Sequence, residues 1–167
     1  MDWVDVGLLL IRLSLGATLL MHGWNHWFGG GKIPGTAGWF ESLGLRPGVF
    51  HAWASVVTEI AAGLGLVVGL LTPLACAATV GVMAVAAIVA HRPNGFFVFR
   101  DGYEYVLMIA VICVALGAIG PGRISLDHAL DIEITGLAGF LIALLVGLGG
   151  TAFLLATTWR PAKTPAE

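Results

Sequence analysis

The sequence predicts an all-α integral membrane protein: a helix bundle with a four-helix core and a fifth, C-terminal transmembrane helix. Composition is the first observation, because 58% of the 167 residues are hydrophobic and only 11% are charged, against about 25% in a soluble domain. The second is the mean hydropathy of +0.94. The third is the arrangement of apolar residues in five runs long enough to span a bilayer. A net charge of −2 without a basic stripe excludes a nucleic-acid partner.

Each apolar run is compatible with a spanning helix, which needs about 20 residues. The runs are 4–28, 50–71, 73–91, 104–120 and 136–159. The second and third are joined by Leu-Thr-Pro at 71–73, so we expect a tight antiparallel hairpin with the proline in a first helical turn, where it is tolerated. We predict a membrane domain over residues 1–135, an added transmembrane helix over 136–159 and a short cytoplasmic tail over 160–167.

The distribution of charge predicts the orientation, because Lys and Arg favour the cytoplasmic face. Six basic residues follow the first, third and fifth runs: Lys32, Arg46, Arg92, Arg100, Arg160 and Lys163. The opposite ends of the runs contain one, Arg123, beside five acidic residues. The sequence therefore predicts a multi-pass protein with its N-terminus outside and its C-terminus in the cytoplasm.

Five ionisable residues lie within the runs or at their ends: His22, His26, Glu59, His91 and Glu104. Such residues are expensive in lipid and are functional-site candidates for that reason. With the predicted orientation, all five fall in the cytoplasmic leaflet. At the helical rise, His22 lies about 9 Å and Glu59 about 13 Å deep. Arg12 lies about 11 Å beyond Glu59 by the same measure and is a candidate counter-charge for its carboxylate.

These side chains suit more than one ligand. The five together could bind a transition metal, for which imidazole and carboxylate are suitable ligands. With Arg12 they could instead bind a quinone head group, which needs hydrogen bonds and proton transfer. Haem held by two axial histidines is a third option, which is favoured less than a metal ion or a quinone. In the alternative without a ligand, the histidines belong to an aromatic belt at the membrane interface and Glu104 caps its helix.

Several short motifs follow one another along the chain. They are LIRLSLG (10–16), MHGW (21–24), WFESLGL (39–45), TEIAAGL (58–64), VGLLTP (68–73), NGFF (94–97), GYEY (102–105) and GPGRISLD (120–127). This ordered set, over about residues 8–128, resembles the DoxX family of small bacterial membrane proteins. The chain departs from the family in two respects. Family members typically carry a lysine where this chain has His26, and their core has four spans, so the fifth is an extension.

The resemblance implies redox work at the bacterial cytoplasmic (inner) membrane. The family is named after a subunit associated with a terminal quinol oxidase and thiosulfate:quinone oxidoreduction, and other members are linked to oxidative and thiol stress. We therefore expect a redox-associated protein that binds a quinone or a metal within a larger oxidoreductase or respiratory complex. Its partners would be the lipid bilayer and other proteins, the latter through the Gly-rich fifth helix.

Two other functions stay open. One is a non-catalytic accessory subunit of an energy-transducing membrane complex, in which the polar residues only join helices. The other is a small transporter or proton conductor that uses Glu59 and Arg12. The residues do not decide whether the protein is an enzyme.

Overall fold

The computed structural model describes residues 2–161, which form helices joined by short connections with no strand among them. The elements are α1 (Trp3–Phe28), α2 (Lys32–Ser42), α3 (Gly48–Val68), α4 (Thr72–Ala86), the π-helical turn η1 (Ala87–His91), the 3-10 turns η2 (Arg92–Asn94) and η3 (Val98–Arg100), α5 (Glu104–Ile119), α6 (Leu126–Ala129), α7 (Gly136–Leu141), the π-helical turn η4 (Ile142–Val146) and α8 (Gly147–Thr158). The predicted all-α class is confirmed, and every apolar run coincides with a helix to within three residues at each end.

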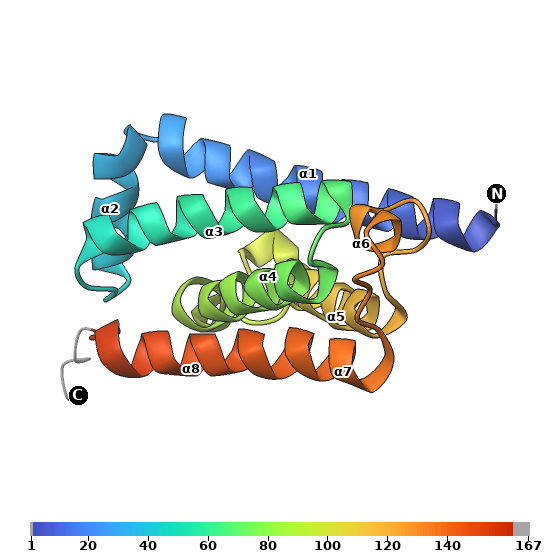
Figure 1. Ribbon diagram of the computed structural model, residues 1–167. Coiled ribbons are helices and arrows are strands. Elements are labelled where there is room, and N and C mark those ends of the chain that lie inside the picture. The colour runs from blue at the N-terminus through green and yellow to red at the C-terminus, as the bar shows by residue number, and fades with distance from the viewer. Residues whose placement is uncertain (1, 162–167) are drawn as a thin grey trace.

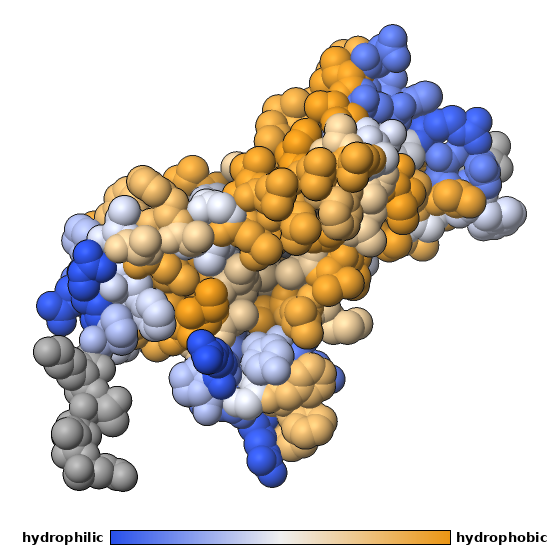
Figure 2. Space-filling view, turned by 90° about the horizontal axis from the view of Figure 1, so that it is seen from below, coloured by the Kyte–Doolittle hydropathy of each residue, from blue (hydrophilic) through white to orange (hydrophobic). Residues whose placement is uncertain are grey.

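Four helical segments within residues 2–161 are long and apolar enough to cross a bilayer. They are Trp3–Phe28, Gly48–Val68, Thr72–Asn94 and Gly136–Thr158. The predicted fourth span, α5, is a shorter apolar helix of 16 residues, or about 24 Å. Figure 2 shows a broad apolar surface along the bundle, with hydrophilic residues gathered towards its two ends and on a part that protrudes between them. These helices imply a lipid bilayer as the surroundings of the protein.

The helices lie in layers, with α1 and α3 side by side above, α4 and α5 in the middle and α7–α8 below (Figure 1). The start of α1 and the end of α8 lie at opposite ends of the bundle (Figure 1). The end of α8 is tied to the segment after α2, because the indole nitrogen of Trp159 donates to the carbonyl oxygen of Leu43 at 2.9 Å. Residues 162–167 of the predicted tail, Lys163 among them, lie outside the described residues.

Glycines allow the fifth helix to pack closely inside the bundle. A Cβ atom at Gly147 would lie 2.7 Å from the carbonyl oxygen of Ala77 in α4, and one at Gly117 in α5 would lie 3.0 Å from the carbonyl oxygen of Gly139. Small residues let helix backbones approach in this way. These glycines of the fifth helix therefore serve contacts within this chain, whereas Gly149 has no atom within 4 Å of such a Cβ.

Arg12 and Asp127 organise the end of the bundle that holds the N-terminus. Arg12 is fully buried, and its guanidinium donates to the carbonyl oxygens of Leu66, at 3.4 Å, and Ile124. Asp127 is also buried and accepts from the backbone nitrogens of Leu71, at 2.6 Å, and Thr72, at 2.8 Å. The aspartate thus caps the start of α4, and the arginine joins the end of α3 to the connection before α6.

Candidate functional site

A cavity of about 780 Å³ lies between α1, α3, α4, α5 and α8, with α2 along one side. Its lining includes four of the residues that the sequence predicted to form one site: His22, His26, Glu59 and His91. The remaining two predicted residues, Arg12 and Glu104, are not part of the lining. The volume falls in the range of about 300–1,000 Å³ that is typical of small-molecule sites.

Glu59 is the most deeply buried ionisable group of the cavity, with 3% of its surface exposed. Its Oε1 atom accepts a hydrogen bond from the Ser55 hydroxyl at 3.0 Å and lies 3.7 Å from Nε2 of His26. The second oxygen, Oε2, is buried without a hydrogen-bond partner. Because an unpartnered buried polar atom is costly, this oxygen is suited to accept a hydrogen bond from a molecule in the cavity.

His26 is held at the last turn of α1 by the helix that follows. The ring of His26 stacks against Trp39, with centroids 6.0 Å apart, and lies 5.7 Å from the ring of Phe40. The hydroxyl of Thr36 donates to the carbonyl oxygen of His26 at 2.9 Å. Thr36, Trp39 and Phe40 also line the cavity, so α2 both positions this imidazole and closes one side of the site.

His91 and Tyr105 form a hydrogen-bonded pair on another side of the cavity. Nδ1 of His91 lies 2.7 Å from the carbonyl oxygen of Asp101, and Nε2 lies 2.8 Å from the hydroxyl of Tyr105. A carbonyl oxygen only accepts, so the proton of the neutral ring belongs on Nδ1 and the tyrosine hydroxyl donates to Nε2. The pair joins the end of η1 to the first turn of α5, and both residues line the cavity.

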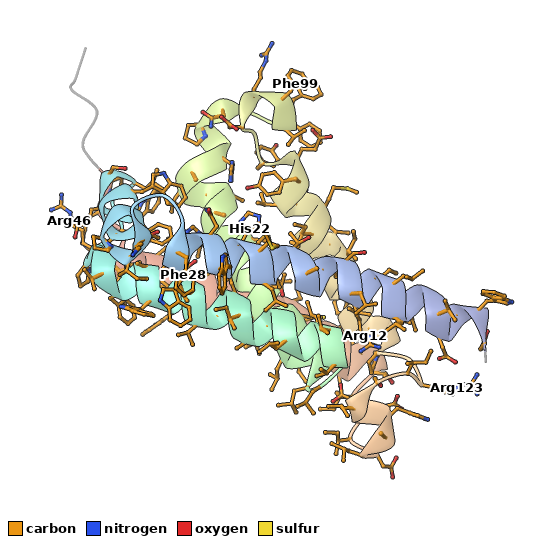
Figure 3. All side chains as sticks on the ribbon, turned by 90° about the horizontal axis from the view of Figure 1, so that it is seen from above. Arg12, His22, Phe28, Arg46, Phe99 and Arg123 are labelled. Carbon is orange, nitrogen blue, oxygen red and sulfur yellow. The ribbon has the colours of Figure 1, made fainter. Side chains whose placement is uncertain are left out.

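The other predicted residues divide between the cavity and the scaffold. Figure 3 shows His22 on the side of α1 that faces α4 and α5. Oε2 of Glu104 accepts from the backbone nitrogen of Val98 at 2.9 Å and so holds the loop before α5. The contact of Glu104 is thus structural, which is closer to the alternative in which Glu104 caps its helix than to ligand binding.

Arg12 is not the counter-charge of Glu59. The Cβ atom of Glu59 packs against Gly23 of α1, and Arg12 lies eleven residues earlier in that helix, about 16 Å along its axis. Figure 3 shows Arg12 near the opposite end of the bundle from Phe28. The physical reason is that carbonyl groups from two distant segments, at Leu66 and Ile124, surround its guanidinium.

Several lining residues were not predicted from the sequence as members of the site. His51 is 4% exposed, and its Nε2 atom is buried without a hydrogen-bond partner. Ser55, Thr58 and Tyr105 line the cavity too. A signal was available for two of them, because His51, Ser55 and Glu59 recur every four residues and therefore share one face of a largely apolar helix.

The geometry does not assemble a metal centre among residues 2–161, where no three His, Cys, Asp or Glu side chains are close enough to hold an ion together. The cavity instead combines hydrogen-bonding groups from α1, α2, α3 and α5 with apolar walls from α4 and α8. Such an arrangement can bind an organic molecule with a polar part and an apolar part.

The comparisons with known proteins give one match. The family model described as DoxX matches residues 7–92, which is just over half of the 167 residues. No curated protein and no solved structure matches the chain. The matched part runs from α1 to the start of η2 and includes His22, His26, Glu59 and His91. This small membrane protein therefore belongs to the DoxX family.

Proposed function

We propose that the protein is a redox-associated membrane protein whose cavity binds the head group of a quinone. One observation carries the proposal. Oε2 of Glu59 and Nε2 of His51 are buried side-chain atoms without hydrogen-bond partners, and both residues line the same cavity. Each is costly to leave unpaired, so a ligand with two suitably placed polar atoms would stabilise both.

A quinone fits this pair chemically. It supplies two ring oxygens that accept hydrogen bonds when oxidised and donate them when reduced. A protonated Glu59 can donate and an ionised Glu59 can accept, and an imidazole can do either, so the two side chains together are suited to both forms. The Tyr105 hydroxyl already donates to His91, which leaves its oxygen free to accept a further hydrogen bond.

The wider setting supports the same proposal. Quinones dissolve in the bilayer, and helices that are long and apolar enough to cross a bilayer line the cavity. The redox associations that the DoxX resemblance implies point the same way. With the orientation that the charges favour, the cavity opens in the cytoplasmic leaflet, and we propose that the protein works there within a larger oxidoreductase or respiratory complex.

The test is a binding titration of the full-length protein in lipid nanodiscs. The probe is the reduced, quinol form of a benzoquinone with a decyl tail, whose hydroxyls can donate to the Glu59 carboxylate. Its binding is followed through quenching of tryptophan fluorescence, since Trp39 lines the cavity. We expect saturable binding that is at least about tenfold weaker in Glu59→Gln, because a hydrogen bond to a charged group contributes about 1.5–3 kcal/mol.

Asp131→Asn is the matched control. It makes the same change from carboxylate to amide at an exposed residue near the opposite end of the bundle, and its affinity should equal that of the unaltered protein. Absence of saturable binding to the unaltered protein, or equal affinities for it and Glu59→Gln, would contradict the proposal.

A further inference from the structure

We propose that the side of the cavity formed by α4 and α8 holds the hydrocarbon tail of the ligand, so that the fifth helix selects for tailed quinones. The inference rests on the proposed function and adds a role for a helix that lies beyond the family match, which ends at residue 92.

The two sides of the cavity differ in chemistry. Its ionisable groups come from α1, α3, η1 and α5, and α2 adds the hydroxyl of Thr36. The lining residues from α4, η4 and α8 are apolar or glycine with one exception, Thr151. A ligand that spans the cavity therefore meets hydrogen-bonding groups at one end and hydrocarbon at the other.

Thr151 does not alter the apolar character of its side. The hydroxyl of Thr151 donates to the carbonyl oxygens of Gly81 and Gly147, each at 3.1 Å. Its single proton is thus already shared between two acceptors within the bundle. No hydrogen-bond donor is left on this wall for a second polar group of a ligand.

The volume of the cavity exceeds what a head group alone would fill. An engineered cavity of about 150 Å³ accommodates a benzene ring. The 780 Å³ of this cavity is about five times that volume. Because the ionisable groups belong to other helices, the remaining space adjoins the apolar wall, where a chain of methylene groups fits the surroundings.

Two neighbouring glycines of α8 allow the inference to be tested. Gly150 lines the cavity and Gly149 does not. A Cβ atom at either position would have no atom within 4 Å, so a larger side chain is accommodated at both without disturbing the packing of the helix. Leucine at Gly150 would extend into the space assigned to the tail, whereas leucine at Gly149 would not.

The experiment compares two probes in the nanodisc titration: a benzoquinone with a decyl tail and the same ring without a tail. In Gly150→Leu, we expect the affinity for the tailed probe to fall about tenfold, because overpacking of a filled site is costly, and the affinity for the tailless probe to stay unchanged. In Gly149→Leu, both affinities should match those of the unaltered protein. Partitioning of the tailed probe into lipid is common to all variants and cancels in the comparison.

The outcomes separate this inference from the proposed function. Binding of both probes with no selective loss in Gly150→Leu, or an equal loss in Gly149→Leu, would overturn the tail site and leave the quinone site standing. No saturable binding of either probe to the unaltered protein would overturn both. Decanol serves as a third probe, and competition by decanol as strong as that of the tailed quinone would indicate a general lipid site instead. If Gly150→Leu does not fold, Gly150→Val provides the same comparison with a smaller side chain.

Discussion

Nε2 of His26 lies 3.7 Å from Oε1 of Glu59, so the last turn of α1 and the middle of α3 meet at the polar side of the cavity. The DoxX resemblance leads us to expect a lysine at this position, where this chain carries a histidine. The imidazole adds a second contact that an aliphatic amine would not, because its ring stacks against Trp39. The two contributions of His26, to Glu59 and to the aromatic rings of α2, can be separated by substitution.

The first prediction concerns this pair. His26→Phe keeps an aromatic ring beside Trp39 and Phe40 but removes the nitrogen that faces Glu59. In a double-mutant cycle with Glu59→Gln, we expect the two changes to be non-additive by about 0.5–3 kcal/mol in the free energy of unfolding, as for other contacting residues. Reversible unfolding in sodium dodecyl sulfate, followed by circular dichroism, measures the cycle. Additive effects would mean that the two side chains do not interact.

The second prediction separates Arg12 from the cavity. Arg12→Met leaves the carbonyl groups of Leu66 and Ile124 without their buried donor. We expect unfolding to become easier by about 1–3 kcal/mol, the cost of an unsatisfied buried polar group, while the affinity of the folded protein for the tailed quinone stays unchanged. Thermal unfolding and the nanodisc titration measure the two quantities.

Arg123→Met is the matched control for that change. The Arg123 side chain is 61% exposed and pairs with Asp5 at 2.8 Å, and exposed ion pairs contribute little to stability. We expect a smaller loss than for Arg12→Met. Loss of ligand binding in Arg12→Met with unchanged stability would instead restore the view that Arg12 acts on Glu59.

The third prediction concerns the loop between η1 and α5. Tyr105→Phe removes the hydroxyl that fixes the ring of His91, which in turn contacts the carbonyl oxygen of Asp101. A hydrogen bond contributes about 0.5–1.5 kcal/mol net, so we expect backbone amides of residues 95–102 to exchange about 2- to 12-fold faster. Hydrogen–deuterium exchange with mass spectrometry detects this change. In Tyr103→Phe, whose ring packs against Phe96, exchange should change less.

The fourth prediction tests how firmly the fifth helix belongs to the bundle. A Cβ atom at Gly147 would already lie 2.7 Å from the carbonyl oxygen of Ala77, so Gly147→Val should overpack the contact with α4 and cost about 1–3 kcal/mol. Gly149→Val meets open space and should leave stability nearly unchanged. Thermal unfolding in detergent compares the two. An equal response would show that α8 does not depend on its contact with α4.

The membrane makes much of this fold predictable from the sequence. A spanning helix must be apolar over a nearly fixed length, so the run 73–91, for example, ends at His91, where η1 ends. The depth of the candidate residues followed from the same counting, and His22, His26, Glu59 and His91 do line one cavity. Counting residues along one helix does not show which residues of other helices lie next to it.

The remaining parts of the site depend on such neighbours. Arg12 was assigned to Glu59 because both interrupt apolar runs, but its partners come from the end of α3 and the connection before α6. His51 lies in the first turn of α3, where a histidine is expected to meet the membrane interface, but it is buried in a helix against which α2 packs. Glu104 begins α5, as the apolar run predicted, but the adjacent loop supplies its partner, Val98.

The π-helical turn η1 makes the length of this segment matter as much as its composition. A π-turn holds one more residue than the α-helical turn it replaces, and each helical residue rotates the chain by about 100°. Removing one residue between Ala87 and His91 would therefore swing the imidazole away from Tyr105, however apolar the segment remained. The position of His91 in the cavity wall therefore depends on the number of residues in η1. Substitutions within this turn are tolerated, whereas an insertion or a deletion is not.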